Sequence, residues 1–194
     1  MSLRLQPESE SNTFILQMHQ RLKTIADDLG ISESLLLAKN LCVYQEATEL
    51  EVVSTDNQGR SYQLTPVAAA AWRKLSACAV LDDVELTLVS AFRSIDRQAD
   101  IIRRKLAADI SIDDILTVLA PPGYSEHHTG CAVDISTPGT APATLAFEQT
   151  SAFAWLNAHA QHFGFYLSFP QDNTYGYQYE PWHWCFHPSS PTAD

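Results

Sequence analysis

Apolar residues recur along this chain with two different periods, one typical of helices and one typical of strands. Between residues 13 and 29 they recur every three or four positions, which predicts an amphipathic helix that ends at Gly30. A shorter helix is expected at residues 34–41. These two helices form a predicted N-terminal extension, residues 1–45. Amphipathic stripes usually bury against their own domain, so we expect this extension to pack on the rest of the chain.

Residues 46–194 are predicted to form one globular unit in which helices and strands are mixed. The segment Asp56-Asn57-Gln58-Gly59 separates two short alternating segments, which is typical of a hairpin. Helices are predicted at residues 66–80, 95–106, 111–120 and 151–162, and strands at 50–53, 61–64, 84–92, 131–135, 165–169 and 177–186. This mixed order favours an α+β fold with a small, largely antiparallel sheet and flanking helices.

The charge of the chain bears on its partners. Its 12 basic and 23 acidic residues give a net charge of −11, and no basic run is longer than Arg103-Arg104-Lys105. A nucleic-acid partner is not expected, because binding to a phosphate backbone depends on clustered Lys and Arg. No stretch approaches about 18 uninterrupted apolar residues, so no membrane span is predicted. The composition does not indicate an oligomeric state.

The N-terminus and the cysteines bear on the compartment. The first residues contain no apolar segment of the kind that a signal peptide needs. The four cysteines are sparse and form no Cys-x-x-Cys pair, which is typical of free thiols in a reducing compartment. The sequence as it stands therefore predicts a cytoplasmic location, and a periplasmic one if a leader is missing.

Candidate metal-binding and catalytic residues are concentrated in two short segments, residues 125–134 and 180–183. The first contains His127 and Asp134, and the second contains Glu180 and His183. Two histidines and an aspartate can bind a catalytic zinc ion, because three protein ligands leave a fourth position for water. A spare glutamate is what such a site needs to move a proton from that water to a leaving group.

Spacing alone leaves some of these assignments open. His128 competes with His127, because a loop can aim either imidazole at a metal. Cys131 and Cys185 flank the candidate ligands and are rival soft ligands, although a structural role is expected for both. Alternation along the last strand places Cys185 on the same face as His183.

The order Ser-x-His-x-x-Gly-x-Ala-x-Asp followed by Glu-x-Trp-His resembles the VanY-like D-alanyl-D-alanine carboxypeptidases, within the Hedgehog/DD-peptidase group of zinc folds. The resemblance covers roughly residues 60–187. It implies that His127, Asp134 and His183 bind one zinc ion and that Glu180 is the catalytic base. It also favours His127 over its neighbour as the ligand.

An upstream segment, residues 90–94, resembles the arginine segment of the same family. The resemblance implies that Arg93 and Gln98 face the substrate. Ser125, which opens the motif, and Trp182, which lies between Glu180 and His183, are further candidate substrate-binding residues. A planar guanidinium suits a carboxylate, so Arg93 is expected either to hold the terminal carboxylate of a substrate or to assist the oxyanion.

The function that the resemblance implies is hydrolysis of the C-terminal D-alanine of peptidoglycan stem peptides or their precursors. Two alternatives share the same zinc chemistry: a D-Ala-D-Ala dipeptidase and a carboxypeptidase for the L,D bond. A third is a zinc-containing binding module that has lost catalysis. The presence of Glu180 argues against that third alternative.

Overall fold

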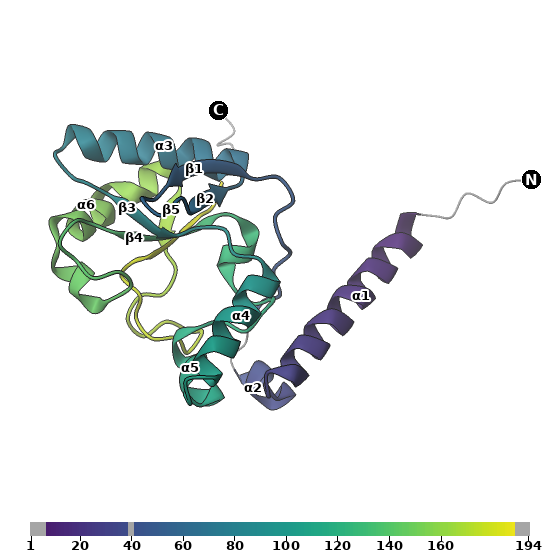
Figure 1. The fold of residues 1–194 in the computed structure, drawn as a ribbon. Coiled ribbons are helices and arrows are strands. Elements are labelled where there is room, and N and C mark those ends of the chain that lie inside the picture. The colour runs from purple at the N-terminus through teal and green to yellow at the C-terminus, as the bar shows by residue number, and fades with distance from the viewer. Residues whose placement is uncertain (1–6, 39–40, 189–194) are drawn as a thin grey trace, which may run out of the picture.

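The computed structural model describes residues 7–38 and 41–188, in which helices and strands follow in mixed order (Figure 1). The helices are α1 (Pro7–Asp28), α2 (Glu33–Ala38), α3 (Pro66–Leu81), α4 (Ile95–Leu106), α5 (Ile112–Val118) and α6 (Ser151–His159). Short 3-10 helices are η1 (Glu126–Thr129), η2 (Leu145–Gln149) and η3 (Ala160–Phe163). The strands are β1 (Glu51–Thr55), β2 (Ser61–Leu64), β3 (Thr87–Ser90), β4 (Ala132–Ser136), β5 (Phe165–Leu167) and β6 (His183–Phe186). No helix in the described ranges is both long and apolar enough to cross a membrane.

The strands form two antiparallel sheets. β1 and β2 make the predicted hairpin, and the other four strands lie side by side in the order β3-β4-β6-β5. The predicted α+β fold with a small antiparallel sheet is therefore confirmed. The two inner strands, β4 and β6, pair in a register that places Asp134 directly opposite His183.

The two faces of the inner strands have different neighbours, because successive side chains of a strand point to opposite faces. Val133, Ile135 and Trp184 belong to the main hydrophobic core, where they join apolar residues of α3 and α6. Asp134 and His183 are buried as well, but they belong to the alternate positions and face away from that core. In Figure 1, α3 lies above the sheet, and α4 and α5 lie below it.

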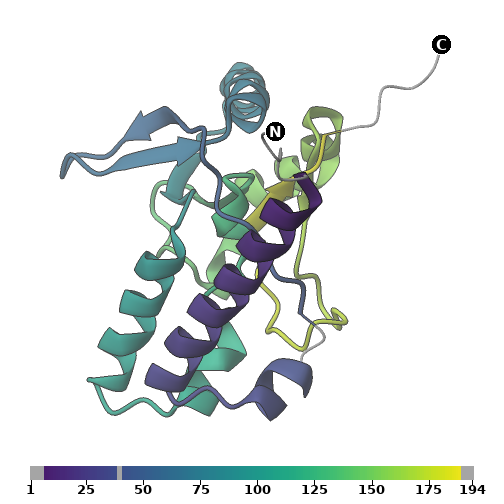
Figure 2. The same ribbon diagram turned by 90° about the vertical axis from the view of Figure 1, so that its right-hand side faces the viewer.

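The predicted N-terminal extension contacts α4 and α5. A second hydrophobic cluster combines Ala26, Leu29 and Ile31 with apolar residues of those two helices, and Figure 2 shows α1 running alongside α4. The Arg21 side chain binds Asp96 at 2.8 Å from the same side. The stripe that predicted α1 is thus buried in its C-terminal half.

Several elements differ in length from the prediction. α1 begins at Pro7, in a segment that carries no apolar stripe to signal a helix. α2 ends at Ala38, and part of the predicted remainder lies outside the described residues. The strand predicted at residues 84–92 is confined to β3, and the one at 165–169 to β5.

The largest difference is at residues 177–186, where only β6 is a strand and residues 177–182 are irregular. Pro181 has no N–H to give to a ladder. The N–H of Glu180 donates instead to the carbonyl of Phe169 at 3.1 Å. Residues 177–182 therefore have the composition of a strand but do not pair as one.

Gly164, after η3, is predicted to tolerate alanine worse than Gly139 does. Both have positive φ (+81° and +83°), which costs a residue with a Cβ about 1 kcal/mol. A Cβ at Gly164 would in addition lie 2.8 Å from the Phe186 ring and 3.1 Å from a backbone oxygen, whereas Gly139 is open. We expect Gly164→Ala to lower the free energy of unfolding by about 2–4 kcal/mol and Gly139→Ala by about 1 kcal/mol. Urea unfolding measures both, and equal losses would show that the close packing at Gly164 is unimportant.

Candidate active site

The turn η1 presents His127 to the face of the sheet that carries Asp134 and His183. The Ser125 hydroxyl accepts a hydrogen bond from the N–H of His127 at 3.4 Å, and Gly130 ends the turn with φ +66°. A Cβ at Gly130 would meet the side chains of Leu50, Thr65 and Ala47 at 3.0–3.2 Å, so the turn is packed tightly against the hairpin side of the fold.

His127, Asp134 and His183 converge, and the atoms that could bind a metal lie within 4.8 Å of one another. Nε2 of His127 is 3.2 Å from Oδ2 of Asp134. Nδ1 of His183 is 3.0 Å from Oδ1 of the same carboxylate. All three residues are buried, so the structure brings together the three residues that the sequence singled out.

The outward nitrogen of each histidine has its own partner. Nδ1 of His127 lies 2.7 Å from the carbonyl of Ala91, and Nε2 of His183 lies 2.9 Å from Oε2 of Glu126. Both partners are acceptors, so these nitrogens carry protons and the opposite nitrogens, which face Asp134, are the ones that can bind a metal. Metal-binding histidines are typically oriented in this way. The donor set and its orientation therefore fit a zinc ion.

Glu126 is a site residue that sequence reasoning missed. It is adjacent to His127, but the group that it holds, His183, is 57 positions away on β6. Burial alone would raise the pKa of Glu126, but the hydrogen bond and charge of His183 outweigh burial and lower it. Glu126 is therefore an ionised partner for His183.

His128 is fully buried, and both of its ring nitrogens are used within the turn region. Nδ1 lies 2.6 Å from the carbonyl of Arg93, and Nε2 accepts the N–H of Gly123 at 3.0 Å. Of the two neighbouring histidines, only His127 faces Asp134. Cys185 belongs to a different group of side chains, with Glu126 and His187.

The pKa of each residue in this cluster depends on the charges and hydrogen bonds of its neighbours. Burial by itself would raise the pKa of Asp134, but the charge of His127 and hydrogen bonds from both histidines hold it well below the usual range. Burial would lower the pKa of His183, yet its hydrogen bonds to Asp134 and Glu126 raise it to about 10. Without a metal, His183 is therefore protonated between two carboxylates, and a bound cation would displace that proton.

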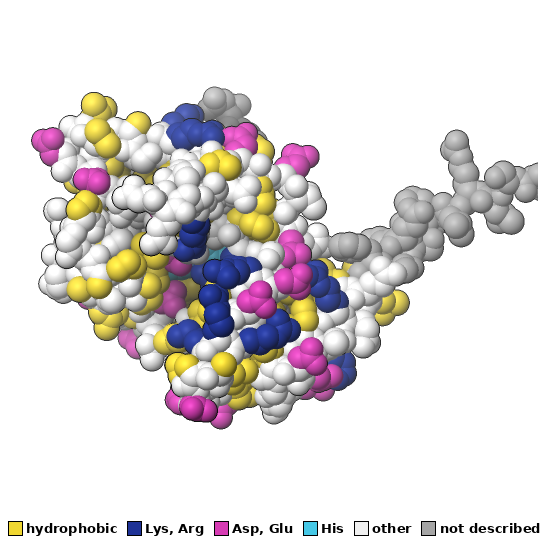
Figure 3. All heavy atoms as spheres, viewed as in Figure 1, with side chains coloured by type: hydrophobic (Ala, Val, Ile, Leu, Met, Phe, Trp, Pro, Cys, Tyr) yellow, Lys and Arg dark blue, Asp and Glu magenta, His cyan; other side chains and the backbone are white. Residues whose placement is uncertain are grey.

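These residues line a cleft with a volume of about 560 Å³. In Figure 3 the cleft is the hollow at the centre of the face, with histidine at its floor and Lys and Arg side chains beside it. The cleft wall also includes the other site residues predicted from the sequence, which are Arg93, Gln98, Ser125, Glu180 and Trp182. The structure thus gathers every predicted site residue around one cavity.

Glu180 lies in the irregular segment just before β6. Its carbonyl accepts the N–H of His183 at 3.0 Å, which ties the segment to the strand. Burial raises the pKa of Glu180 to about 7, against the lowering effect of His183. A carboxylate that titrates near neutral pH is suited to accepting and releasing a proton during catalysis.

Arg93 is held in the cleft wall by two side chains. Its Nη1 donates to Oε1 of Gln98 at 2.7 Å, and its Nη2 donates to the Ser90 hydroxyl at 3.1 Å. Nη2 is also 3.6 Å from Oδ2 of Asp134. Gln98 is completely buried and donates its own N–H to the carbonyl of Ala120 at 2.6 Å. Gln98 therefore orients Arg93.

Comparison with known sequences identifies related proteins. The model of the VanY D-alanyl-D-alanine carboxypeptidase family matches residues 61–189. The putative carboxypeptidase YodJ of Bacillus subtilis (strain 168) is 34% identical over 119 residues, which are 60% of this chain. That match spans 43% of YodJ, so this chain corresponds to less than half of its relative.

Two solved structures share the fold. The LD-carboxypeptidase LdcB, whose structure concerns peptidoglycan recognition, has a TM-score of 0.63 and 28% identity over 73% of this chain and 69% of LdcB. The D,D-pentapeptidase VanY from a VanB-type vancomycin resistance cassette, a point mutant in complex with Zn(II), has a TM-score of 0.58 and 26% identity. That match covers 76% of this chain and 83% of VanY.

The two neighbouring histidines are expected to behave differently on substitution. His127→Ala should abolish metal binding at the three-residue site, because it removes one ligand atom. His128→Asn should leave metal binding in place but lower the free energy of unfolding by about 1–3 kcal/mol, because buried hydrogen-bonding groups lose their partner. Metal content by mass spectrometry and thermal unfolding check the pair. A folded His128 variant that binds one metal ion fewer than the wild type, beside a His127 variant that keeps the wild-type number, would reverse the assignment.

Proposed function

The chain belongs to the VanY D-alanyl-D-alanine carboxypeptidase family, and on that premise we propose that it is a zinc-dependent peptidase that removes the C-terminal D-alanine of peptidoglycan stem peptides. The observation that carries the proposal is the convergence of His127, Asp134 and His183 in the cleft that also contains Glu180. One zinc ion per chain is held by those three residues. The Zn(II) complex of the related VanY supports the choice of metal.

When bound, zinc supplies Lewis acidity, which activates water as a nucleophile and polarises a carbonyl oxygen. Glu180 accepts the proton of the attacking water and passes it to the amine of the departing D-alanine. The partly buried position of Glu180, with its pKa of about 7, suits both transfers near neutral pH. Glu126 and the Ala91 carbonyl keep the two histidines in the orientation that the site needs.

Arg93 recognises the terminal carboxylate of the substrate. An arginine carries five N–H donors, and Gln98 and the Ser90 hydroxyl each accept from one of its terminal nitrogens. These contacts hold the guanidinium in a fixed plane beside Asp134, which suits bidentate binding of a carboxylate. Ser125 and Trp182 contribute to the wall around the bound peptide.

A second candidate is hydrolysis of the L,D bond of a tetrapeptide, and it is favoured by the similarity to LdcB. The metal-loaded protein should be incubated with tri-, tetra- and pentapeptide stems and the products identified by mass spectrometry. Loss of one alanine from the pentapeptide supports the D,D activity, and loss of one alanine from the tetrapeptide supports the L,D activity. Hydrolysis of free D-Ala-D-Ala, incubated in parallel, would indicate a dipeptidase. No turnover of any of these substrates would indicate a binding module.

Glu180→Ala is predicted to separate catalysis from metal binding. Because Glu180 transfers protons and is not a ligand, the variant should bind as much zinc per chain as the wild-type protein while kcat falls about 10²–10⁴-fold. Zinc content and initial rates with the pentapeptide measure the two effects. If the variant binds one zinc ion fewer than the wild-type protein, Glu180 is a ligand and the proposed mechanism is wrong.

Arg93→Lys is predicted to impair recognition of the free carboxylate despite keeping the charge. A lysine cannot reproduce the planar pair of donors, so kcat/KM should fall by at least about 10-fold. Arg97→Lys, on the exposed surface of α4, is the matched control and should leave the rate unchanged.

The decisive measurement for Arg93 compares free-acid substrates with the same peptides amidated at the C-terminus. The wild-type protein should cleave the free acid much faster. Equal rates on the two substrates would refute carboxylate recognition and would favour an endopeptidase.

A further inference from the structure

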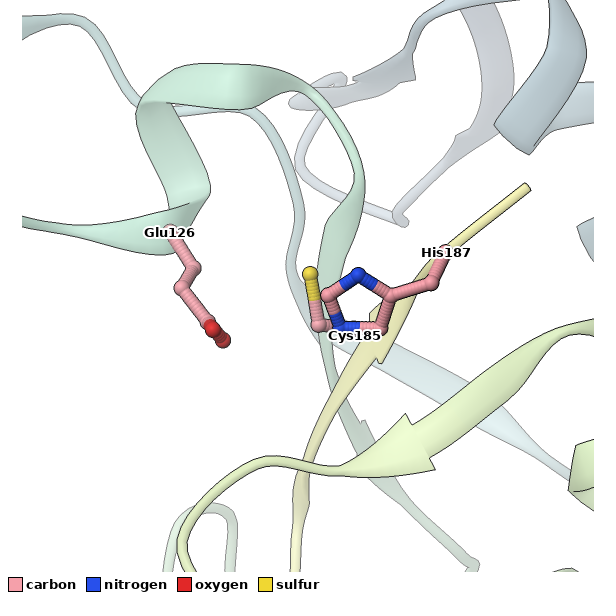
Figure 4. A group of neighbouring side chains, drawn as sticks. All are labelled: Glu126, Cys185 and His187. Atoms are coloured by element: carbon pink, nitrogen blue, oxygen red, sulfur yellow. The ribbon is translucent and has the colours of Figure 1, made fainter. Parts of the chain in front are cut away.

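A second group of metal-binding side chains lies behind His183. Glu126, Cys185 and His187 bring one carboxylate oxygen, the thiol sulfur and one ring nitrogen within 4.8 Å of one another. Figure 4 shows the Glu126 carboxylate reaching from η1 toward Cys185 on β6 and the ring of His187, which follows that strand.

The fold brings these residues together through two constraints. Strand alternation places Cys185 two positions from His183, on the same face of β6, and His183 in turn binds Glu126 at 2.9 Å. His187 is anchored just past the strand, where its N–H donates to the carbonyl of Gly164 at 2.8 Å. Its exposed ring packs near Tyr166, with 5.7 Å between ring centroids.

The Glu126 carboxylate binds a residue of the catalytic group through one of its two oxygens. Among the residues that the structure describes, His183 is the ion-pair partner of Glu126, and the hydrogen bond between them is made by Oε2. A carboxylate can bind one group with each oxygen. Glu126 can therefore hold His183 and bind a cation at the same time.

The ligand atoms of these three residues favour one class of metal ion. A thiolate and an imidazole favour zinc and similar transition metals over magnesium or calcium, which prefer sites made entirely of oxygen ligands. Zinc bound to sulfur, nitrogen and oxygen at about 2.0–2.3 Å requires ligand atoms about 3.3–3.8 Å apart. The exposed His187 ring can move toward the Glu126 carboxylate and the buried Cys185 sulfur and so close the remaining gap.

We propose that Glu126, Cys185 and His187 form a second binding site for a transition-metal dication, separate from the three-residue catalytic group. The site goes beyond the proposed peptidase activity and does not require it. Its three ligands leave a fourth position for water. Because Glu126 also orients His183, this carboxylate connects the second site to a ligand of the first.

Titration of the metal-free protein with cobalt(II) tests this site. Coordination by Cys185 should produce a thiolate-to-cobalt charge-transfer band in the near ultraviolet, and the protein should bind two cobalt ions per chain. Cys185→Ala should bind one ion and lose the band. His187→Ala should weaken the binding that gives rise to the band at least about 10-fold, because it removes a ligand. His187 is exposed, so this second variant tests the site without disturbing the core.

Two controls separate this proposal from the catalytic one. Cys78→Ser, on α3 in the main core region, should retain the band and both ions. His127→Ala should lose the catalytic ion yet retain the charge-transfer band, whether or not the protein is a peptidase. A wild-type protein without the band, or a band that persists in Cys185→Ala, would overturn the second site.

Discussion

The cleft depends on one cross-strand pair, Asp134 of β4 opposite His183 of β6. Both side chains occupy the positions that alternate with Val133 and Trp184, which lie in the main core. A slip of one residue in this pairing would turn the polar residues into the core and the apolar ones into the cleft. Burial of Val133 and Trp184 therefore stabilises the strand register that keeps Asp134 and His183 together in the cleft. The stability of the core and the geometry of the site have the same physical origin.

Once this pair is formed, the charges around it must be compensated, because an isolated buried charge is costly. Asp134 is contacted by both histidines and lies near Arg93. His183 is held by a carboxylate at each ring nitrogen, Asp134 on one side and Glu126 on the other. These contacts orient the three candidate ligands before any metal is bound. A cation that enters takes over the compensating charge of a proton, so metal affinity and protonation are coupled.

The positive charge in the wall of the cleft is local. The chain carries a net charge of −11, yet the partly buried Arg93 lies in the cleft wall and is held by Gln98 and Ser90. Net charge influences long-range association, whereas the position of single charges determines what a buried site can bind. An acidic protein can therefore present a basic group to a substrate carboxylate.

The sequence by itself determined the elements whose signals are local. The helix predicted at residues 95–106 has the same bounds as α4, because its capping serine and its apolar spacing are contained within the helix. The antiparallel α+β architecture was also predictable, and so were the candidate residues that line the cleft, apart from Glu126. The resemblance of the motifs to one family is local in the same sense, since it depends on short spacings.

Only the tertiary structure decided which of these residues meet, and through which atoms. His127 and His128 are chemically identical neighbours, and they differ because Arg93 and Gly123 occupy both nitrogens of His128. Residues 177–182 have the composition of a strand, but the N–H of Glu180 bonds to Phe169 and the segment borders the cleft. Glu126 gains its role from a histidine 57 positions away. Contacts between distant segments depend on the packing of the whole fold, and no local pattern in the sequence specifies them.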